Sequence, residues 1–250
     1  MTMIVYGHRG ASKERPENTM EAFRFALELG ADAIETDVHV TRDGAVVVHH
    51  DPDGARTAGD PRRIDAMTLK EVRTWDVATM DRARGGRVVA DGPHRVPTFD
   101  ELLEEVDVRI NVDVKSEAPS AVERVLEVVQ RHDAAGRVLL TSFHDAVVRD
   151  IWRRGYRGET GLARNGVLLA LAPGLPRPFW PRGARVQIPI AMGPLSLSSP
   201  RTIARLHARG LAVDYWVVDD PALARRLRDD SADGVMSDDV REVVRGLGAS

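Results

Sequence analysis

Strand-like and helix-like patterns alternate along almost the whole chain, and no other feature of the sequence limits the fold so strongly. Within 121–132, for example, Val122, Val125, Leu126 and Val129 form one apolar stripe at helical spacing. Such alternation predicts a parallel sheet, because each helix carries the chain back to the edge where the next strand begins. Nine runs have a strand-like composition: Ile4–Tyr6, Ala33–Val40, Ala45–His49, Arg109–Val114, Val138–Thr141, Thr160–Ala163, Ala184–Ile188, Leu211–Val218 and Gly234–Ser237.

Capping residues predict where several helices begin and end. Ser199 and Asp220 each precede a proline that suits the first helical turn. Asn18 with Glu21 resembles a capping box, and Gly30 follows that helix as a stop signal.

Nine strands are one more than a closed (β/α)8 barrel contains. Ala33–Val40 and Ala45–His49 are joined by Thr41-Arg42-Asp43-Gly44, a turn that is too short for a parallel crossover. Either the second barrel strand bends there, or Ala45–His49 is a short neighbouring segment. The length fits a single domain over residues 1–250, since α/β barrels of this size are common.

Residues 51–96 differ in composition from the rest of the chain. They are rich in Gly, Pro, Asp and Arg and contain one plausible helix, Leu69–Trp75. We expect this segment to be an insertion that lies over one end of the sheet, at the active site.

Composition excludes several kinds of function. The chain has no cysteine, so it has no disulfides, thiolate nucleophiles or zinc–thiolate sites. The net charge of -3 gives no electrostatic reason to expect nucleic acid as a partner. The N-terminus lacks the pattern of a secretory signal, and no apolar run approaches the roughly 20 residues of a membrane span. We therefore expect a cytoplasmic protein with a small-molecule partner and no stable membrane insertion; the oligomeric state is not predicted.

Acidic residues cluster at the ends of two candidate strands. Glu35 and Asp37 point to the same side of one strand, and Asp113 lies on the next, so the three could hold a hard divalent cation. The alternative is a buried carboxylate network paired with Arg9 and Lys115. Three converging carboxylates repel one another unless a cation lies between them. Lys115 could neutralise a phosphate or form an ion pair with Asp113.

Two histidines follow predicted strands beside these carboxylates. His8 and His50 suit an acid/base pair, because imidazole titrates near neutral pH. Arg9, next to His8, could bind phosphate oxygens at two points. We expect structural roles for His39 and for His49, which should face away from His50.

Short motifs occur in order through nearly the whole chain. The more specific ones are His8-Arg9-Gly10, Pro16-Glu17-Asn18-Thr19, Glu35-Thr36-Asp37-Val38, Thr41-Arg42-Asp43-Gly44, His50-Asp51 and Asp113-Val114-Lys115, followed by weaker matches through Asp238. Together they resemble the glycerophosphodiester phosphodiesterase family. The resemblance implies an α/β fold, a (β/α)8 TIM barrel with a small insertion after the second strand. It also implies metal-dependent hydrolysis of phosphodiesters such as glycerophosphocholine to glycerol phosphate and an alcohol.

The resemblance also implies residue roles. His8 and His50 would be the acid/base pair, and Arg9 and Lys115 would contact the phosphate during catalysis and binding. The metal, Mg²⁺ or Ca²⁺, would be bound by Glu35, Asp37 and Asp113.

Two departures from the family pattern concern the metal and the substrate. Asp113 stands where the family typically has Glu, and its side chain is one methylene shorter. The late Trp-Thr-Val-Asn pattern is here Trp216-Val217-Val218-Asp219, which loses a hydroxyl and introduces a possible charge. Phe143 and Trp216 are candidates to line the pocket for the glycerol or the head group.

Three alternatives remain open from the sequence. The apolar stretch Val167–Trp180 could adapt the barrel to lysolipids or sphingolipids, as in lysophospholipase D-type enzymes. The protein could instead bind phosphodiesters without hydrolysing them, with Asp113 marking a weakened metal site. A metal-free mechanism with two histidines and an arginine is the third. The sequence also leaves open whether water or the glycerol 2-hydroxyl attacks, and which histidine is the acid.

Overall fold

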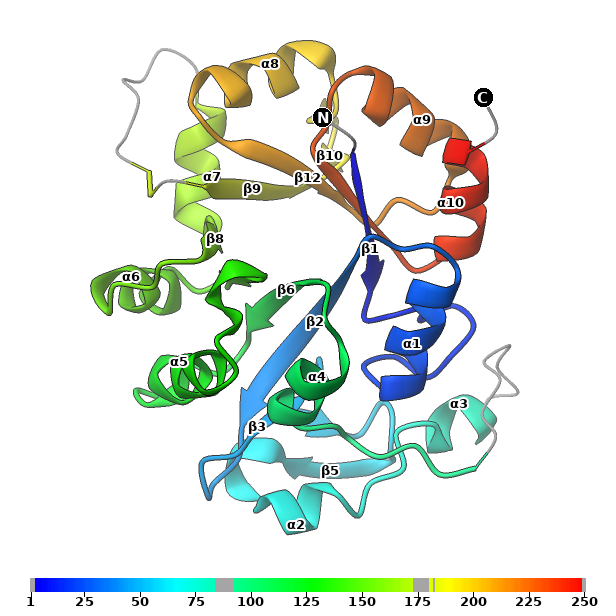
Figure 1. The fold of residues 1–250 in the computed structure, drawn as a ribbon, viewed down its shortest axis with the longest axis vertical. Coiled ribbons are helices and arrows are strands. Elements are labelled where there is room, and N and C mark those ends of the chain that lie inside the picture. Colours follow the sequence, from blue (N-terminus) through cyan, green and yellow to red (C-terminus); the bar gives the residue numbers. More distant parts are fainter. Residues whose placement is uncertain (1–2, 84–91, 173–179, 182, 249–250) are drawn as a thin grey trace.

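In the computed structural model, which describes residues 3–83, 92–172, 180–181 and 183–248, eight parallel strands close into a barrel (Figure 1). Closure occurs because β1 pairs with both β13 and β2. The (β/α)8 fold is therefore confirmed. The barrel strands are β1 (Ile4–His8), β2 (Ala33–Val40), β6 (Arg109–Val114), β7 (Val138–Thr141), β8 (Glu159–Gly161), β9 (Ala184–Pro189), β12 (Ala212–Trp216) and β13 (Gly234–Ser237).

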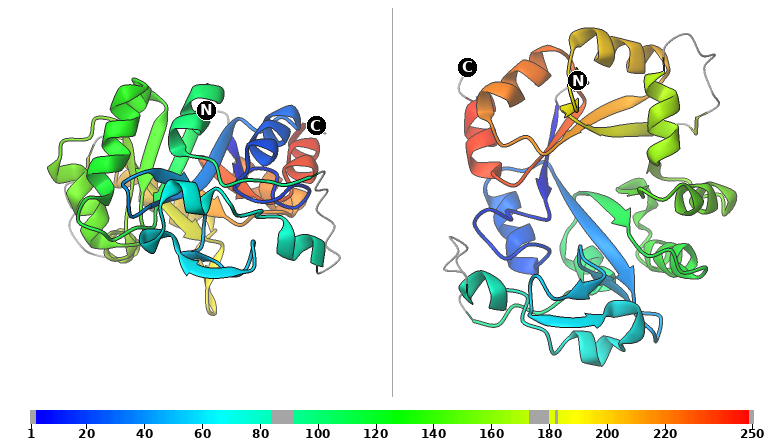
Figure 2. Two further views of the ribbon diagram at one scale, coloured as in Figure 1. Left: turned by 90° about the horizontal axis from the view of Figure 1, so that it is seen from below. Right: turned by 180° about the vertical axis from the view of Figure 1, so that it is seen from behind.

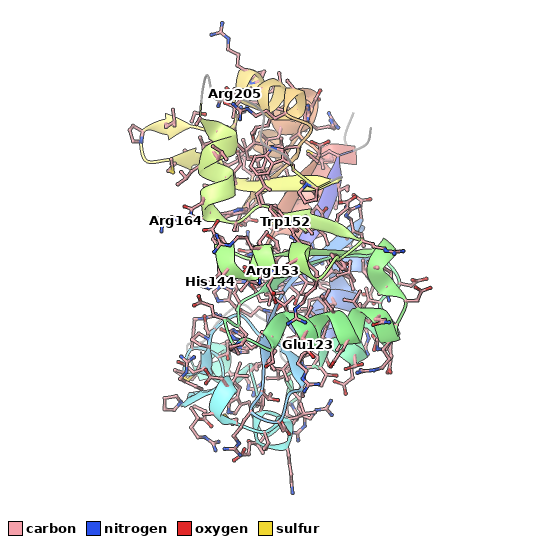
Figure 3. The ribbon with its side chains drawn as sticks, turned by 90° about the vertical axis from the view of Figure 1, so that its left-hand side faces the viewer. Glu123, His144, Trp152, Arg153, Arg164 and Arg205 are labelled. Carbon is pink, nitrogen blue, oxygen red and sulfur yellow. The ribbon has the colours of Figure 1, made fainter. Side chains whose placement is uncertain are left out.

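Helices follow the strands and cover the outside of the barrel. The predicted stripe of α5 (Ala121–Arg131) is buried at Val122, Val125 and Val129. Charged side chains, such as Glu123 of α5 and Arg153 of α6, project outward (Figure 3). The apolar core thus lies between sheet and helices. The outer helices are α1 (Met20–Glu28), α4 (Phe99–Glu105), α5 (Ala121–Arg131), α6 (Asp145–Arg153), α7 (Arg164–Leu171), α8 (Pro200–Ala208), α9 (Pro221–Asp229) and α10 (Val240–Gly248).

The predicted caps are confirmed at two helices and wrong at a third. The Ser199 and Asp220 side chains accept hydrogen bonds from the first turns of α8 and α9. Thr19, rather than Asn18, caps α1, and Gly30 ends it with a φ of 94°. Asn18 instead donates a hydrogen bond to Asp37, at 3.1 Å, which takes its side chain away from the helix.

The extra strand lies outside the barrel. β3 (Val46–Val48) pairs antiparallel with β2, so it is the short neighbouring segment rather than a bend in the second barrel strand. The predicted run Ala45–His49 was too long at both ends. Other strand limits also shift: β1 continues to His8, whereas β8 and β12 end before the predicted Ala163 and Val218.

The chain between β3 and α4 builds a small layer beside the carboxyl end of β2 (Figure 1). Its helix α2 ends at Val72, three residues before the predicted end, because Trp75 turns into a local apolar core with Ile64 and Met67. The Trp75 indole N–H donates to Asp60 at 2.9 Å. The segment contains β4 (Asp53–Gly54), β5 (Asp60–Arg63), a 3-10 turn (Ile64–Ala66), α2 (Leu69–Val72) and α3 (Thr79–Ala83).

A second segment outside the barrel sheet follows β9. The short antiparallel strands β10 (Ala191–Met192) and β11 (Leu195–Ser196) form a hairpin that projects from the body of the barrel (Figure 2). A further 3-10 turn, Ala134–Gly136, precedes β7.

In the part of the chain that the structure describes, no helix has both the length and the apolar character needed to cross a bilayer.

Candidate active site

The register of the barrel strands places the predicted site residues next to one another. His8 of β1 lies opposite Glu35 of β2, and Asp37 of β2 lies opposite Asp113 of β6. A cavity of about 630 Å³ opens at this end of the barrel. Its lining includes every predicted site residue: His8, Arg9, Glu35, Asp37, His50, Asp113, Lys115, Phe143 and Trp216.

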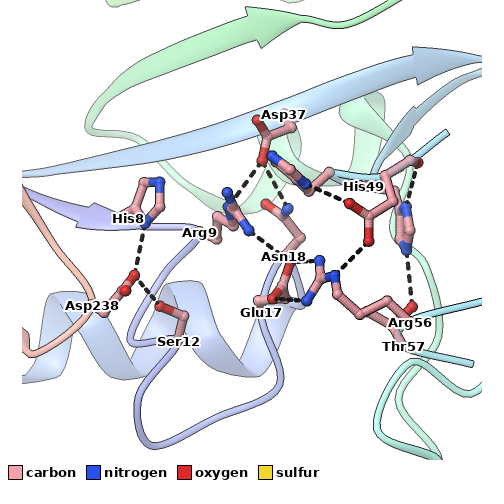
Figure 4. A network of polar contacts seen from close by, with 12 residues as sticks. His8, Arg9, Ser12, Glu17, Asn18, Asp37, His49, Arg56, Thr57 and Asp238 are labelled. Carbon is pink, nitrogen blue, oxygen red and sulfur yellow. Dashed lines mark hydrogen bonds and ion pairs between the residues drawn. The ribbon is translucent and has the colours of Figure 1, made fainter. Parts of the chain in front are cut away.

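Arg9 enters the site through an unusual backbone turn. Its φ of 56° is left-handed, a conformation that is costly for most residues and concentrates at functional sites. Gly10 follows with a φ of 82°, and a Cβ there would lie 2.5 Å from the backbone of Ala22. The turn directs the guanidinium Nε to within 3.3 Å of Asp37, while Nη1 donates to Glu17 at 3.1 Å (Figure 4).

His8 is oriented by a carboxylate from the other end of the chain. Its Nδ1 lies 2.7 Å from Asp238 Oδ1, which also accepts from the Ser12 hydroxyl at 2.7 Å (Figure 4). The other ring nitrogen, Nε2, lies 3.8 Å from Glu35. Burial lowers the pKa of His8, but Glu35 and Asp238 raise it by more, so the net shift is upward.

His50 is likewise oriented by a carboxylate, here that of the next residue, Asp51. Its Nδ1 lies 2.7 Å from Asp51 Oδ1, and Arg56 donates to the other oxygen of Asp51 at 2.5 Å. Arg56 also donates two hydrogen bonds to Glu17, at 2.6 and 2.7 Å. Because Glu17 accepts from Arg9 as well, a continuous chain of ion pairs joins the two histidine-bearing segments (Figure 4).

The three acidic residues are all buried, but their pKa values shift in different directions. Burial and the charge of Asp37 raise the pKa of Glu35 to about 7. Burial also raises the pKa of Asp113. Only Asp37 has a lowered pKa: burial acts to raise it, but Lys115 and Arg9 outweigh that effect. Lys115 Nζ lies 2.6 Å from Asp113 and 3.0 Å from Asp37.

These side chains have the chemistry of a hard-cation site. Asp113 Oδ1 and Asn111 Oδ1 are buried without a hydrogen-bond partner, and both residues line the cavity. Buried unpaired oxygens are costly, and carboxylate and amide oxygens are the ligands that Mg²⁺ and Ca²⁺ prefer. Among the described residues, however, no three acidic or histidine side chains form a ready-made metal cluster. The ammonium of Lys115 lies between two of the three predicted ligands.

The histidines that were expected to be structural lie outside the lining of the cavity. His49 is buried, with Nδ1 2.9 Å from the carbonyl oxygen of Asp51 and Nε2 3.1 Å from the hydroxyl of Thr57. Burial lowers the pKa of His49 and lowers that of His39 to about 4. His39 Nε2 lies 3.1 Å from the carbonyl oxygen of His50, so its ring supports the backbone at that residue.

Sequence reasoning did not assign roles to the residues that orient the histidines. Asp51 and Asp238 stand in the quoted motifs, and Glu17 stands in another, yet nothing local shows which ring they contact. The charge predicted at Asp219 also has a structural explanation. Its carboxylate accepts from the peptide N–H of Asp238, at 2.9 Å, and from that of Asp239, so it holds the segment that carries Asp238.

Phe143 and Trp216 both line the cavity, and Trp216 also packs against the buried cluster of Tyr6, Ala33 and Met236. Their ring centroids are 6.0 Å apart at an edge-to-face angle of 76°, and Phe143 is 57% exposed. Of the predicted apolar stretch Val167–Trp180, residues 167–171 belong to α7, and residues 173–179 lie outside the described residues.

Two histidines, three carboxylates, an arginine and a lysine line one cavity of this closed parallel barrel. This arrangement fits a phosphoric diester hydrolase of the TIM-barrel class, and the comparisons with known proteins support that class. The chain belongs to the glycerophosphoryl diester phosphodiesterase family, which it matches over residues 8–242.

Individual relatives agree with this assignment. The chain is 34% identical to a Mycobacterium tuberculosis protein provisionally named as a glycerophosphodiester phosphodiesterase, over 94% of this chain and 87% of the relative. It is 29% identical to the glycerophosphodiester phosphodiesterase of Caldanaerobacter subterraneus, over 98% and 97%. A solved structure from Silicibacter pomeroyi with the same provisional assignment is 27% identical, superposes with a TM-score of 0.80, and matches 98% of this chain and 93% of its own. Membership and fold together support hydrolysis of glycerophosphodiesters.

Proposed function

We propose that the protein hydrolyses glycerophosphodiesters by acid–base catalysis with His8 and His50. The observation that carries the proposal is the shared arrangement of the two rings. Each histidine has Nδ1 2.7 Å from a carboxylate oxygen, and each lines the same cavity. An Nδ1–H that donates to a carboxylate fixes the tautomer and leaves Nε2 to accept or donate the catalytic proton.

In this mechanism, Arg9 and Lys115 bind the phosphate oxygens and offset the charge that develops on them. One histidine removes a proton from the attacking oxygen as that oxygen bonds to phosphorus. The other protonates the oxygen of the leaving alcohol as its bond to phosphorus breaks. Both the attacking water and the glycerol 2-hydroxyl are compatible with this geometry.

We further propose that Glu35, Asp37 and Asp113 hold a divalent cation, Mg²⁺ or Ca²⁺, as in the family generally. Support comes from the unpaired Asp113 oxygen and from the burial of all three carboxylates beside one cavity, since buried carboxylates require a cation or a hydrogen-bond partner. When bound, such an ion polarises phosphoryl oxygens. Lys115 would then exchange its contact with Asp113 for one with the phosphate.

The test is product formation from glycerophosphocholine, measured as glycerol phosphate and choline. His8→Ala and His50→Ala are each expected to lower kcat by roughly 10²- to 10⁴-fold. His207→Ala is the matched control, since His207 is not among the residues that line the cavity and pairs with Asp233. Wild-type-like turnover in both cavity variants would refute the two-histidine mechanism.

A chelator series tests the cation separately. Activity lost after exhaustive chelation and restored by Mg²⁺ or Ca²⁺ supports the proposed ligands. Full activity after chelation would favour the metal-free mechanism, and binding without turnover at saturating cation would favour a non-catalytic binding protein. A cytoplasmic location, a single domain over residues 1–250 and the role of 51–96 as a cover for the site remain predictions.

A further inference from the structure

Arg164 faces the active-site cavity from the start of α7 (Figure 3). The residues of α7 that line the cavity are three, four and seven positions beyond it, so they share one face of the helix with it. This face consists of Arg164, Val167, Leu168 and Leu171. The Arg164 side chain is therefore part of the cavity wall, although it is exposed to solvent.

Arg164 differs from the other arginine and the lysine of the cavity because it has no ion pair. Arg9 Nε lies 3.3 Å from Asp37, and Lys115 Nζ lies 3.0 Å from Asp37 and 2.6 Å from Asp113. Within the described part of the chain, the Arg164 guanidinium has neither a hydrogen-bond partner nor a carboxylate at ion-pair distance. Its planar fork, which matches a carboxylate or a phosphate at two points, is therefore available to a ligand.

The barrel topology separates Arg164 from the groups that would hold the phosphate. β8, which precedes α7, lies four strands from β1 in either direction around the barrel. Strand spacing and tilt make such a barrel roughly 15 Å across. Arg164 is thus placed to meet a different part of the substrate from the phosphate that Arg9 and Lys115 bind. The apolar side chains beside it strengthen its field, because they lower the local dielectric constant.

We propose that Arg164 recognises a second anionic group, a carboxylate or a phosphate, on the head-group alcohol of the glycerophosphodiester. The second anion belongs to that alcohol because glycerol carries only hydroxyl groups. The proposal rests on the proposed function, since the same histidines act on the diester. Water adds its oxygen to phosphorus, the bond from phosphorus to the head-group oxygen breaks, and that oxygen takes a proton. The products are glycerol phosphate and an alcohol that keeps its anionic group.

The experiment uses two pairs of substrates that differ by one anion. Glycerophosphoserine has one carboxylate more than glycerophosphoethanolamine, and bis(glycerophospho)glycerol has a second phosphate that glycerophosphoglycerol lacks. The readout for all four is the initial rate of glycerol phosphate release. We expect kcat/KM to rise roughly five- to twentyfold with the added anion in at least one pair, beyond the twofold that a second cleavable phosphate gives statistically. The pair with the larger gain identifies the anion as a carboxylate or a phosphate.

Two arginines supply a variant and a matched control. Arg164→Gln is expected to remove the gain within the preferred pair, and Arg164→Lys, which keeps the charge without the fork, to retain part of it. Arg149 lies on the neighbouring helix α6, is also exposed and has no side-chain partner among the described residues, but it does not line the cavity. Arg149→Gln should therefore leave both the gain and the turnover of all four substrates unchanged.

The outcomes separate this inference from the proposed function. If the diesters are hydrolysed but neither added anion raises kcat/KM, the role of Arg164 is refuted while the proposed function stands. A gain that survives in Arg164→Gln would also refute it, as would one that Arg149→Gln lowers equally, because that result indicates an effect of overall charge. If no diester is hydrolysed, the proposed function fails and this inference fails with it.

Discussion

Replacing Arg56 by methionine tests whether the ion-pair chain beside the cavity positions His50. Arg56 donates to Asp51 at 2.5 Å and to both oxygens of Glu17, and Asp51 in turn lies 2.7 Å from His50 Nδ1. Methionine keeps the length of the side chain and removes all three donors. Asp51 and Glu17 then have no guanidinium between them.

The structure predicts a small loss of stability and a larger loss of activity. The Arg56 side chain is 40% exposed, so water screens its charge, and we expect the free energy of unfolding to fall by only about 1–2 kcal/mol. A displacement of a catalytic group by about 1 Å can lower the rate roughly 10²-fold. We therefore expect kcat to fall by about two orders of magnitude with little change in KM.

The pH profile gives an independent signature. The bonds from Arg56 help to lower the pKa of Asp51 and of Glu17 against the opposing effect of burial. Without Arg56 both carboxylates take up a proton at higher pH, and a protonated Asp51 orients His50 less well. The acid limb of kcat/KM should therefore move to higher pH in Arg56→Met and only partly so in Arg56→Lys.

The assay is choline release from glycerophosphocholine as a function of pH, with urea unfolding as the measure of stability. Arg63→Met is the control, since Arg63 is the last residue of β5 in the same segment, is 58% exposed and pairs with Asp65. If Arg56→Met has the kcat and acid limb of the Arg63 control, the positioning role is refuted. A loss of activity in proportion to the unfolded fraction would show that the role is structural only.

Four further outcomes are expected. Asp238→Asn should lower kcat roughly 10²-fold in the choline-release assay, because the amide no longer orients His8; unchanged kcat would argue against that role. Asp113→Asn should raise the cation concentration needed for half-maximal activity, and an unchanged requirement would remove Asp113 from the ligand set. Asp214 is fully buried and accepts from Arg185, so Asp214→Ala should cost about 3–5 kcal/mol in urea unfolding, whereas a cost below about 1 kcal/mol would show that Arg185 finds another partner. Burial lowers the pKa of His49, so the contribution of the neutral ring to stability is complete above about pH 6.5 and is lost as the pH falls. The difference in the free energy of unfolding between the wild type and His49→Gln should therefore shrink between about pH 7 and pH 5. A constant difference over this range would contradict the prediction.

Much of the fold follows from local patterns. The barrel strands and the buried stripe of α5 lie within a few residues of their predicted positions, because alternation and helical spacing report which side chains face the core. The convergence of Glu35, Asp37 and Asp113 on one cavity was also predictable, since side chains two apart on a strand share a face and parallel strands end together.

Local patterns failed where two choices were chemically equal. Asn18 and Thr19 are both good capping residues. Thr19 caps the helix because the Asn18 amide donates a hydrogen bond to Asp37, which lies 19 positions away. The β2–β3 turn similarly allowed a bend or a separate strand, and the pairing of Val38 with Val48 decided it.

Local sequence therefore accounts for which segments are strands and helices and for which residue types stand at the strand ends. Only the closed barrel decides which groups touch: Asp238 reaches His8 across 230 positions, and Arg56 reaches Glu17 across 39. The cavity likewise combines side chains from distant segments: Leu168 of α7, Met192 of β10 and Trp216 of β12 all line it. Such contacts depend on long-range strand pairing, and no periodicity within one segment specifies its distant partner.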